Sequence, residues 1–269
     1  MHLITLLGHP EKRNLTKDVI ESIAAGTEYQ ILEEGVAARF ESSGIPSTKH
    51  GIDIFAQPKD GTKIKLLVCD MESTIIENEF LDEIADYLGV GGKVAEITAR
   101  AMNGELNFEE ALRERIKLVE GLAETEIANL INTRMKYNEG AHELIKWCSE
   151  NGVYTMLVSG GFTAFTQVVA AELSFNEHHA NQLIFKNGKL ADVANPILGK
   201  EAKLSFLKAK ASEIGISLNE TASMGDGAND LPMLEAAGLG IAYKAKPKVK
   251  EAIKNQINFS SMACLKYLF

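Results

Sequence analysis

The stretch that decides the fold is Leu66-Leu67-Val68-Cys69-Asp70-Met71-Glu72-Ser73-Thr74. An apolar run that ends abruptly in polar residues predicts a buried strand of a parallel sheet. This strand delivers two carboxylates, Asp70 and Glu72, to its C-terminal end. Because alternate residues of an extended segment point the same way, both acids are expected to face one reacting group. One acid would then attack while the other handles protons.

Length and composition predict a globular protein with one full core and a small accessory domain. The chain has 269 residues, of which 45% are apolar. A net charge of -9 argues against nucleic acid or an anionic membrane as a partner. Three cysteines without metal-ligand spacing favour buried thiols in a reducing compartment. No apolar run has the length of a membrane span and no leader pattern is visible, so we predict a cytoplasmic protein.

The first part of the chain is predicted to be a small α+β segment over residues 1–62. It contains no catalytic cluster, so an appendage is expected rather than a second active site. Its expected elements are strands at Ile4–Leu7 and Tyr29–Leu32, a helix from Thr16 to Ala25, a loop from Glu41 to His50, and chain breakers at Pro58 and Gly61.

From Ile64 onward, strand-like runs alternate with helical stretches. This alternation predicts an α/β fold with a Rossmann-like, doubly wound parallel sheet. Between Glu77 and Tyr137 only helical periodicity is visible, which predicts a helical cap over residues 77–137, inserted between core segments 63–76 and 138–269. Placed after the first core strand, the cap would act as a lid. The later core elements are expected at Val153–Val158, Thr221–Met224 and Gly238–Ala242, with a hairpin at Asn181–Ala191.

Polar clusters follow three of the predicted strands. They are Asp70–Thr74, Ser159–Phe162 and Gly225–Asp230. Because open parallel sheets bind ligands outside the carboxyl ends of their strands, these clusters are expected to form one site. Each has a structural alternative: Ser73 or Thr74 as a helix cap, and the glycine-rich clusters as plain turns. The three together provide carboxylates, a hydroxyl and glycines, as a phosphate and a metal require.

These clusters resemble the motifs of the haloacid-dehalogenase-like superfamily of phosphohydrolases. Glu77–Ala85, Asn107–Arg115 and Gly225–Met233 further resemble the phosphoserine phosphatases, and the resemblance covers about residues 64–260. It implies hydrolysis of O-phospho-L-serine to L-serine and phosphate, the last step of serine biosynthesis. Residues 1–60 look like a shortened version of the regulatory-type domain that some bacterial members carry.

The resemblance also implies a Mg²⁺ ion and a set of residues that hold it. Its ligands would be the Asp70 and Asp226 carboxylates and the Glu72 backbone carbonyl, with Asp230 beside them or, alternatively, capping a surface helix. Asp70 would attack phosphorus to form an aspartyl-phosphate. Glu72 would protonate the leaving serine oxygen and later take a proton from water.

The phosphoryl group has its own predicted partners. By resemblance, Ser159 would donate its hydroxyl, helped by the backbone N–H of Gly160, and Lys203 would balance the charge of phosphate and nucleophile. Lys200 is the alternative lysine, while the neighbouring lysines at 208 and 210 are expected on a solvated helix face.

Recognition of the serine part is assigned by the same resemblance. Arg115, whose planar fork suits a carboxylate, and Glu79, which suits an ammonium, would bind the amino-acid moiety. Met102 and Phe108 would be apolar walls of the closed lid, although ordinary packing within the cap explains them equally well. Asn229 would contact the phosphate or only orient Asp226.

The departure from the family is Glu72, because the second acid of the first motif is normally Asp. A glutamate adds about 1.5 Å of reach, against a tolerance of roughly 0.5 Å for catalytic groups. We predict a working enzyme acting on a small-molecule substrate, as a monomer or homodimer. The alternatives are another small phosphomonoester, phosphoryl transfer to an acceptor other than water, or a low-activity phosphoserine- or serine-binding regulator. A dinucleotide site is disfavoured because no Gly-x-Gly-x-x-Gly follows the first strand.

Overall fold

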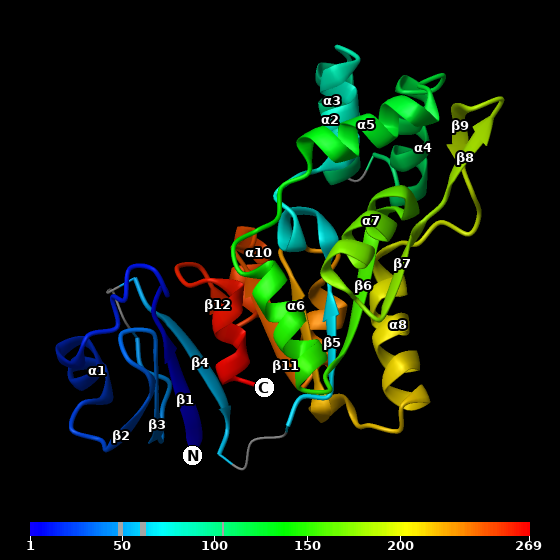
Figure 1. The fold of residues 1–269 in the computed structure, drawn as a ribbon. Coiled ribbons are helices and arrows are strands. Elements are labelled where there is room, and N and C mark those ends of the chain that lie inside the picture. The colour runs from blue at the N-terminus through cyan, green and yellow to red at the C-terminus, as the bar shows by residue number, and fades with distance from the viewer. Residues whose placement is uncertain (48–50, 60–62, 104) are drawn as a thin grey trace.

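The computed structural model describes residues 1–47, 51–59, 63–103 and 105–269. Gly61, the end of the loop expected at 41–50, and the predicted boundary at 62 lie outside the described residues. Figure 1 shows a small sheet formed by the N-terminal strands, a larger sheet next to it, and a group of helices over one end of the larger sheet.

The N-terminal part is a four-stranded antiparallel sheet with strand order β2-β3-β1-β4. The predicted helix and two strands are confirmed, but β3 and β4 were not foreseen. The predicted loop at Glu41 starts inside β3, because Glu41 pairs with Leu3 across the sheet. The elements are β1 (His2–Leu7), α1 (Lys17–Ala24), β2 (Tyr29–Glu33), β3 (Ala37–Ser42) and β4 (Asp53–Pro58).

The core is a six-stranded sheet with strand order β12-β11-β10-β5-β6-β7, in which every neighbouring pair is parallel. The predicted α/β class is therefore confirmed. Leu67 and Cys69 of β5 face one apolar cluster while Leu66 and Val68 face another, so both faces of the sheet are covered. The strands are β5 (Leu66–Cys69), β6 (Tyr154–Phe162), β7 (Glu177–Asn181), β10 (Thr221–Gly225), β11 (Leu239–Tyr243) and β12 (Gln256–Ile257).

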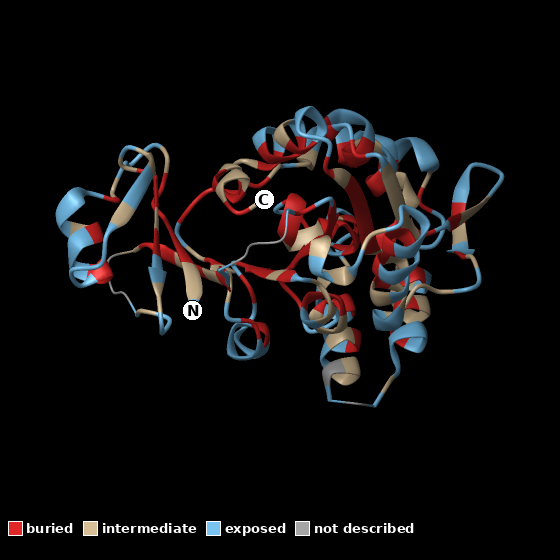
Figure 2. Cartoon of the chain, turned by 90° about the horizontal axis from the view of Figure 1, so that it is seen from below, coloured by how far each residue is buried: buried red, intermediate tan, exposed pale blue. Residues whose placement is uncertain are grey.

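Helices pack against both faces of this sheet, and buried residues gather along the strands beneath them (Figure 2). In the described residues, no helix combines the length and the apolar character needed to cross a membrane. The core helices are α6 (Ala141–Glu150), α7 (Thr163–Leu173), α8 (Lys200–Glu213), α9 (Leu231–Ala236) and α10 (Pro247–Ala252).

Two details of the core differ from the sequence-based expectation. Strand β6 continues through Ser159 to Phe162 instead of ending at Val158, and its pairing with β7 shifts register between Val158 and Phe162. The edge strand β7 was not foreseen, because Glu177–Asn181 has no apolar alternation and becomes a strand only by pairing with β6. The predicted hairpin is confirmed as β8 (Leu183–Lys186) and β9 (Lys189–Val193).

The segment between the first and second core strands is helical, as predicted. It contains α2 (Phe80–Tyr87), α3 (Gly91–Met102), α4 (Phe108–Leu118) and α5 (Glu124–Arg134). The chain enters and leaves it through two adjacent segments, where Ile76 bridges Tyr137 and the Glu77 N–H donates to the Lys136 carbonyl over 2.8 Å. These helices lie above the carboxyl ends of the core strands (Figure 1). The limits at 77 and 137 stay a prediction.

The last segment of the chain joins the two sheets. Asp53 of β4 accepts hydrogen bonds from the backbone N–H groups of Asn258, Phe259 and Ser260, over 2.8–3.0 Å. A 3₁₀ helix, η3 (Met262–Tyr267), follows, and this segment runs between the N-terminal sheet and the core (Figure 1). The N-terminal sheet is thus attached to the core by a segment about 200 residues away from it in sequence.

Candidate active site

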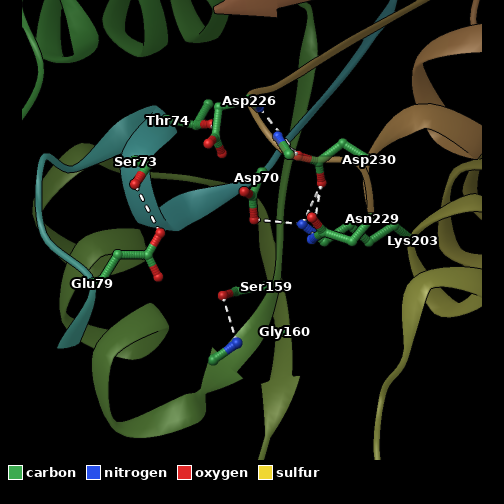
Figure 3. Close-up of polar contacts among 12 residues, drawn as sticks. Asp70, Ser73, Thr74, Glu79, Ser159, Gly160, Lys203, Asp226, Asn229 and Asp230 are labelled. Atoms are coloured by element: carbon green, nitrogen blue, oxygen red, sulfur yellow. Dashed lines mark hydrogen bonds and ion pairs between the residues drawn. The ribbon is translucent and has the colours of Figure 1, made fainter. Parts of the chain in front are cut away.

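The predicted site residues converge at the carboxyl ends of β5, β6 and β10. Asp70 directly follows β5, and its N–H donates to the Met224 carbonyl of β10 over 2.9 Å. Asp226 directly follows β10 itself. Figure 3 shows the Asp70, Asp226 and Asp230 side chains pointing toward one another, with Lys203 reaching in from α8.

A buried ammonium lies between two buried carboxylates. The Lys203 Nζ lies 2.5 Å from the Asp70 Oδ1 and 2.6 Å from the Asp230 Oδ1. Burial alone would lower the pKa of Lys203, but the two carboxylates more than offset this and leave that pKa raised. Burial and the nearby Asp230 raise the pKa of Asp70 well above its usual value. The structure therefore brings Lys203 to Asp70, whereas Lys200 is exposed beside Glu201.

Three carboxylates of this cluster fit a divalent cation. Asp70, Asp226 and Asp230 each offer an oxygen within 4.8 Å of the others, and all three are buried. The Asp226 Oδ2 lies 3.3 Å from the Lys246 Nζ, and its Oδ1 accepts from the Thr74 hydroxyl over 3.4 Å. Carboxylate oxygens are the ligands that Mg²⁺ prefers, and their charge exceeds that of Lys203 alone. The donor set suits the ion that the sequence implies.

Asp230 is part of this cluster and is not a surface helix cap. Its side chain is 0% exposed and makes no capping hydrogen bond to α9. Its Oδ2 accepts from the backbone N–H groups of Asp226 and Gly227 over 3.1 and 2.9 Å. A Cβ atom at Gly225 would lie 2.5 Å from the Asp230 Cγ, so only glycine at position 225 leaves room for this contact. The capping alternative is wrong because Asp230 fixes the loop from within.

The turn after β5 uses Ser73 and Thr74 for contacts across the site. Ser73 adopts φ 55°, and its hydroxyl donates to the Glu79 Oε1 over 2.8 Å. Thr74 donates to Asp226, as described above. Neither side chain caps the following helix, so this alternative is also wrong. The turn instead ties the first predicted cluster to the third and to the exposed Glu79.

Glu72 points toward the start of the cap. Its Oε1 accepts from the Phe80 N–H, at the first turn of α2, over 2.8 Å. Its Oε2 lies so close to Gly161 that a Cβ atom there would be 2.6 Å away. Burial and the charge of Glu79 raise the pKa of Glu72 to about 8. A carboxyl group that stays protonated near neutral pH is suited to donate a proton.

Ser159 is buried near the carboxyl end of β6, where its side chain has one backbone N–H group as a partner. The Ser159 Oγ accepts from the Gly161 N–H over 2.9 Å, while the Gly160 carbonyl accepts from Asn181. Phe108 of the cap, 43% exposed, would lie 3.6 Å from a Cβ atom at Gly160. The cap therefore reaches the phosphate end of the predicted site. The role of the Gly160 N–H stays a prediction.

The remaining cap residues are less firmly held. Within the part of the chain that the structure describes, the Arg115 Nε donates to the Ala111 carbonyl alone, over 3.4 Å. Its guanidinium lies in the electrostatic field of the Asp82, Glu72 and Glu79 carboxylates. Met102 ends α3, but its side chain lies outside what the structure describes. In the core, the exposed Asn229 donates to the Asp230 Oδ1 over 3.5 Å, so it orients Asp230 and not Asp226.

Sequence reasoning missed two side chains at the site, Thr74 as a partner of Asp226 and Lys246. A usable signal existed for Lys246, because it follows β11, the fourth core strand predicted from the sequence, at its carboxyl end. Ligands of open parallel sheets bind at the carboxyl ends of the strands, and the same expectation at the end of β11 would have included Lys246. Nothing in the sequence distinguishes the Thr74 contact from a helix cap.

Comparison with known proteins agrees with this geometry. The family of haloacid dehalogenase-like hydrolases matches residues 67–235. The phosphoserine phosphatase of Archaeoglobus fulgidus is 39% identical over 80% of this chain, which spans only 63% of that relative. That of Streptomyces coelicolor is 33% identical over 99% of this chain and 70% of its own length. A solved phospho-aspartyl intermediate analogue of phosphoserine phosphatase is 40% identical, with a TM-score of 0.70, over 77% of this chain and 100% of that one.

Proposed function

The chain belongs to the haloacid dehalogenase-like hydrolases and, within them, to the phosphoserine phosphatase family, and we propose that it hydrolyses O-phospho-L-serine to L-serine and phosphate. The observation that carries this proposal is the buried cluster of Asp70, Asp226, Asp230 and Lys203 beneath a cap that presents Arg115 and Glu79. With a divalent cation bound, the cluster would suit a phosphate dianion, and the cap residues would suit an amino acid.

The proposed cofactor is Mg²⁺, held by the Asp70 and Asp226 carboxylates and the Glu72 carbonyl, with Asp230 beside it. When bound, this ion would supply the positive charge that draws a phosphate dianion to an anionic nucleophile. The three carboxylates and the raised pKa of Asp70 support this choice, because they leave the cluster in need of positive charge.

In the proposed reaction, an Asp70 carboxylate oxygen attacks phosphorus and the bond from phosphorus to the serine oxygen breaks. Glu72 donates its proton to that oxygen, so serine leaves as an alcohol. Water then attacks the aspartyl-phosphate, Glu72 takes a proton from the water, and Asp70 is regenerated with release of phosphate. Lys203 counteracts the raised pKa of Asp70 and so favours its ionised form, and the Ser159 hydroxyl donates to a phosphate oxygen.

Substrate selection would come from the cap. Arg115 would bind the substrate carboxylate through its fork, and Glu79 would bind the ammonium. Phe108 above Gly160, together with Met102, would exclude water when the cap closes, and Asn229 would hold Asp230 in place. The weak contacts of Arg115 support this assignment, because its guanidinium has donors left for a ligand.

The direct test is a panel of phosphate esters with the purified chain and Mg²⁺. Phosphate release should be fastest from O-phospho-L-serine, should fall for O-phosphoethanolamine, which lacks the carboxylate, and should stop with a chelator. A different best ester would support the alternative of another small phosphomonoester. Release of serine without free phosphate would support transfer to another acceptor.

Glu72 is tested separately with the variant Glu72→Asp. We expect the wild-type chain to turn over, because the longer side chain is held by Phe80 and fitted against Gly161. Phosphoserine binding by calorimetry without turnover, together with turnover restored by Glu72→Asp, would show that the chain is a binding regulator instead. Cytoplasmic location and a monomeric or homodimeric assembly stay predictions.

A further inference from the structure

A second cavity lies away from the catalytic centre, between the N-terminal sheet and the core. Its volume is about 340 Å³, within the range of small-ligand sites. The loop after β1 forms one wall, and the start of α6 with the segments after β11 and β12 forms the other. Its polar lining includes His9, Lys12, Glu139, Lys244 and Asn258. None of them belongs to the predicted catalytic residues.

The walls of this cavity are fixed by hydrogen bonds. Asn14 accepts from the His9 N–H over 2.8 Å, which shapes the loop after β1. The His9 Nδ1 accepts from the Glu11 N–H, so its Nε2 carries the proton and donates to the Glu139 Oε2 over 3.1 Å. Asp53 holds the opposite segment, as described above. The cavity walls are therefore held in place by the protein's own hydrogen bonds. The Glu139 carboxylate already accepts a hydrogen bond from His9.

The cavity has free positive charge. Lys12 and Lys244 are exposed at its rim, and within the described ranges neither ammonium lies within ion-pair distance of a carboxylate. The Lys244 Nζ lies 5.2 Å from the centre of the Tyr243 ring. Two such ammonium groups beside one engaged carboxylate favour an anion.

Two buried polar atoms lack a partner, and both belong to this region. Among the described residues, the buried side-chain atoms without a hydrogen bond are the Asn258 Oδ1 and the Tyr243 hydroxyl. Asn258 lines the cavity, and Tyr243 precedes Lys244, with Glu139 acting on it electrostatically. Buried polar atoms are nearly always paired in folded proteins. Both atoms are closed off from solvent, so a ligand in the cavity would meet the charged side chains of its lining instead.

We propose that this cavity binds a small oxyanion. Its charged oxygens would lie against Lys12 and Lys244. Inorganic phosphate and a small carboxylate such as L-lactate both present such oxygens. The proposal does not depend on the reaction at Asp70.

The test is calorimetric titration of the full chain with inorganic phosphate, and separately with L-lactate, in the presence of a chelator. Without a divalent cation, three carboxylates repel anions from the catalytic centre, so binding there is suppressed. We expect saturable binding of at least one of the two anions. The anion that binds more tightly identifies phosphate or carboxylate as the natural chemistry.

Variants locate the binding. Lys12→Gln with Lys244→Gln should weaken it at least tenfold, and Asn258→Asp should weaken it by charge repulsion. Lys208→Gln, which removes an equally exposed charge on α8, should leave it unchanged. Both cavity lysines are exposed, so the double variant should unfold at the same temperature as the wild type when no anion is added. Absence of saturable binding, equal affinity of the double variant and the Lys208 variant, or loss of binding in Ser159→Ala would overturn the proposal.

Discussion

The two halves of the predicted catalytic centre differ in how deeply their side chains are buried and in how many of their contacts are already made. In the half built by the core, Asp70, Lys203 and Asp230 are at most 5% exposed, and each ion pair among them is no longer than 2.6 Å. In the half built by the cap, Glu79 and Phe108 are exposed. Arg115, also in the cap, has one long hydrogen bond within its own helix.

In the proposed reaction, this difference would separate the residues of the chemical step from those that recognise the substrate. The core half has its geometry fixed by strands and by charges that cannot separate inside the protein without a large cost. The cap half has donors that remain available, so its geometry is completed by the ligand. Substitutions in the core half should therefore affect turnover and stability, whereas those in the cap half should affect affinity.

The largest effect is expected for Asp70→Asn, which removes the nucleophile while leaving Lys203 paired with Asp230. Turnover of O-phospho-L-serine should fall on the order of 10⁵-fold, as for other essential nucleophiles. Initial rates of phosphate release with Mg²⁺ measure this. Asp18→Asn, on the exposed face of α1, is the matched control. A variant that keeps more than about one hundredth of the wild-type rate contradicts the role of Asp70.

The next effect concerns stability and compares Lys203→Met with Lys200→Met. Removing Lys203 leaves two buried carboxylates without their cation, which should cost about 3–5 kcal/mol of unfolding free energy. Lys200 is 69% exposed, so its substitution should stay within about 0.5 kcal/mol. Urea unfolding of the metal-free proteins gives both values. Equal values for the two variants would show that the core half is not held together by its charges.

Glu72, at the border of the two halves, should make stability depend on pH. Its pKa is raised from 4.5 to about 8 in the folded chain, so the folded state binds more protons than the unfolded state between these values. Stability of the metal-free protein should therefore fall as pH rises from 4.5 to 8, by about 2 kcal/mol after allowance for solvent screening.

The variant Glu72→Gln isolates this dependence. It carries no titrating group at position 72, so its free energy of unfolding should lose about 2 kcal/mol less than that of the wild type over the same pH range. Denaturant unfolding at several pH values, with a chelator present, measures the difference. Parallel curves for the two proteins would mean that the pKa of Glu72 is not raised.

The smallest effect is expected in the cap half, for Arg115→Lys. A lysine keeps the charge but loses the two-pronged contact with a carboxylate, so KM should rise about tenfold with kcat nearly unchanged. Steady-state kinetics with O-phospho-L-serine measure both constants. Arg100→Lys is the control, because Arg100 pairs with Glu105 and Glu114 within the cap. A fall in kcat as large as the rise in KM would place Arg115 with the chemistry instead.

The sequence predicted the core half well for a definite physical reason. Strand β5 is a continuous apolar run, and parallel strands bring their carboxyl ends to one edge, so Asp70 and Asp226 had to meet. The family resemblance favours Lys203 over Lys200, and the structure brings Lys203 to Asp70.

What could not be predicted depends on contacts between distant segments. Strand β7 is polar and is defined by its pairing with β6, and β4 is defined by its pairing with β1. The hydrogen bond from Thr74 to Asp226 joins residues 152 positions apart. Local sequence carries no signal for such contacts, because they arise only when the sheet has formed.

The hydrogen bonds between Asp53 and residues 258–260 have a consequence for the order in which the chain assembles. The N-terminal sheet is made first, yet the donors to Asp53, and the Leu268 carbonyl that accepts from Gln57, are made about 200 residues later. At typical synthesis rates this interval lasts roughly 10–40 s. During it, the β4 edge and the Asp53 carboxylate have no partner from their own C-terminal segment, so a finished neighbouring copy could supply one. Nascent chains of this protein should therefore be most prone to exchanging segments until residues 258–260 have been made and have bound Asp53.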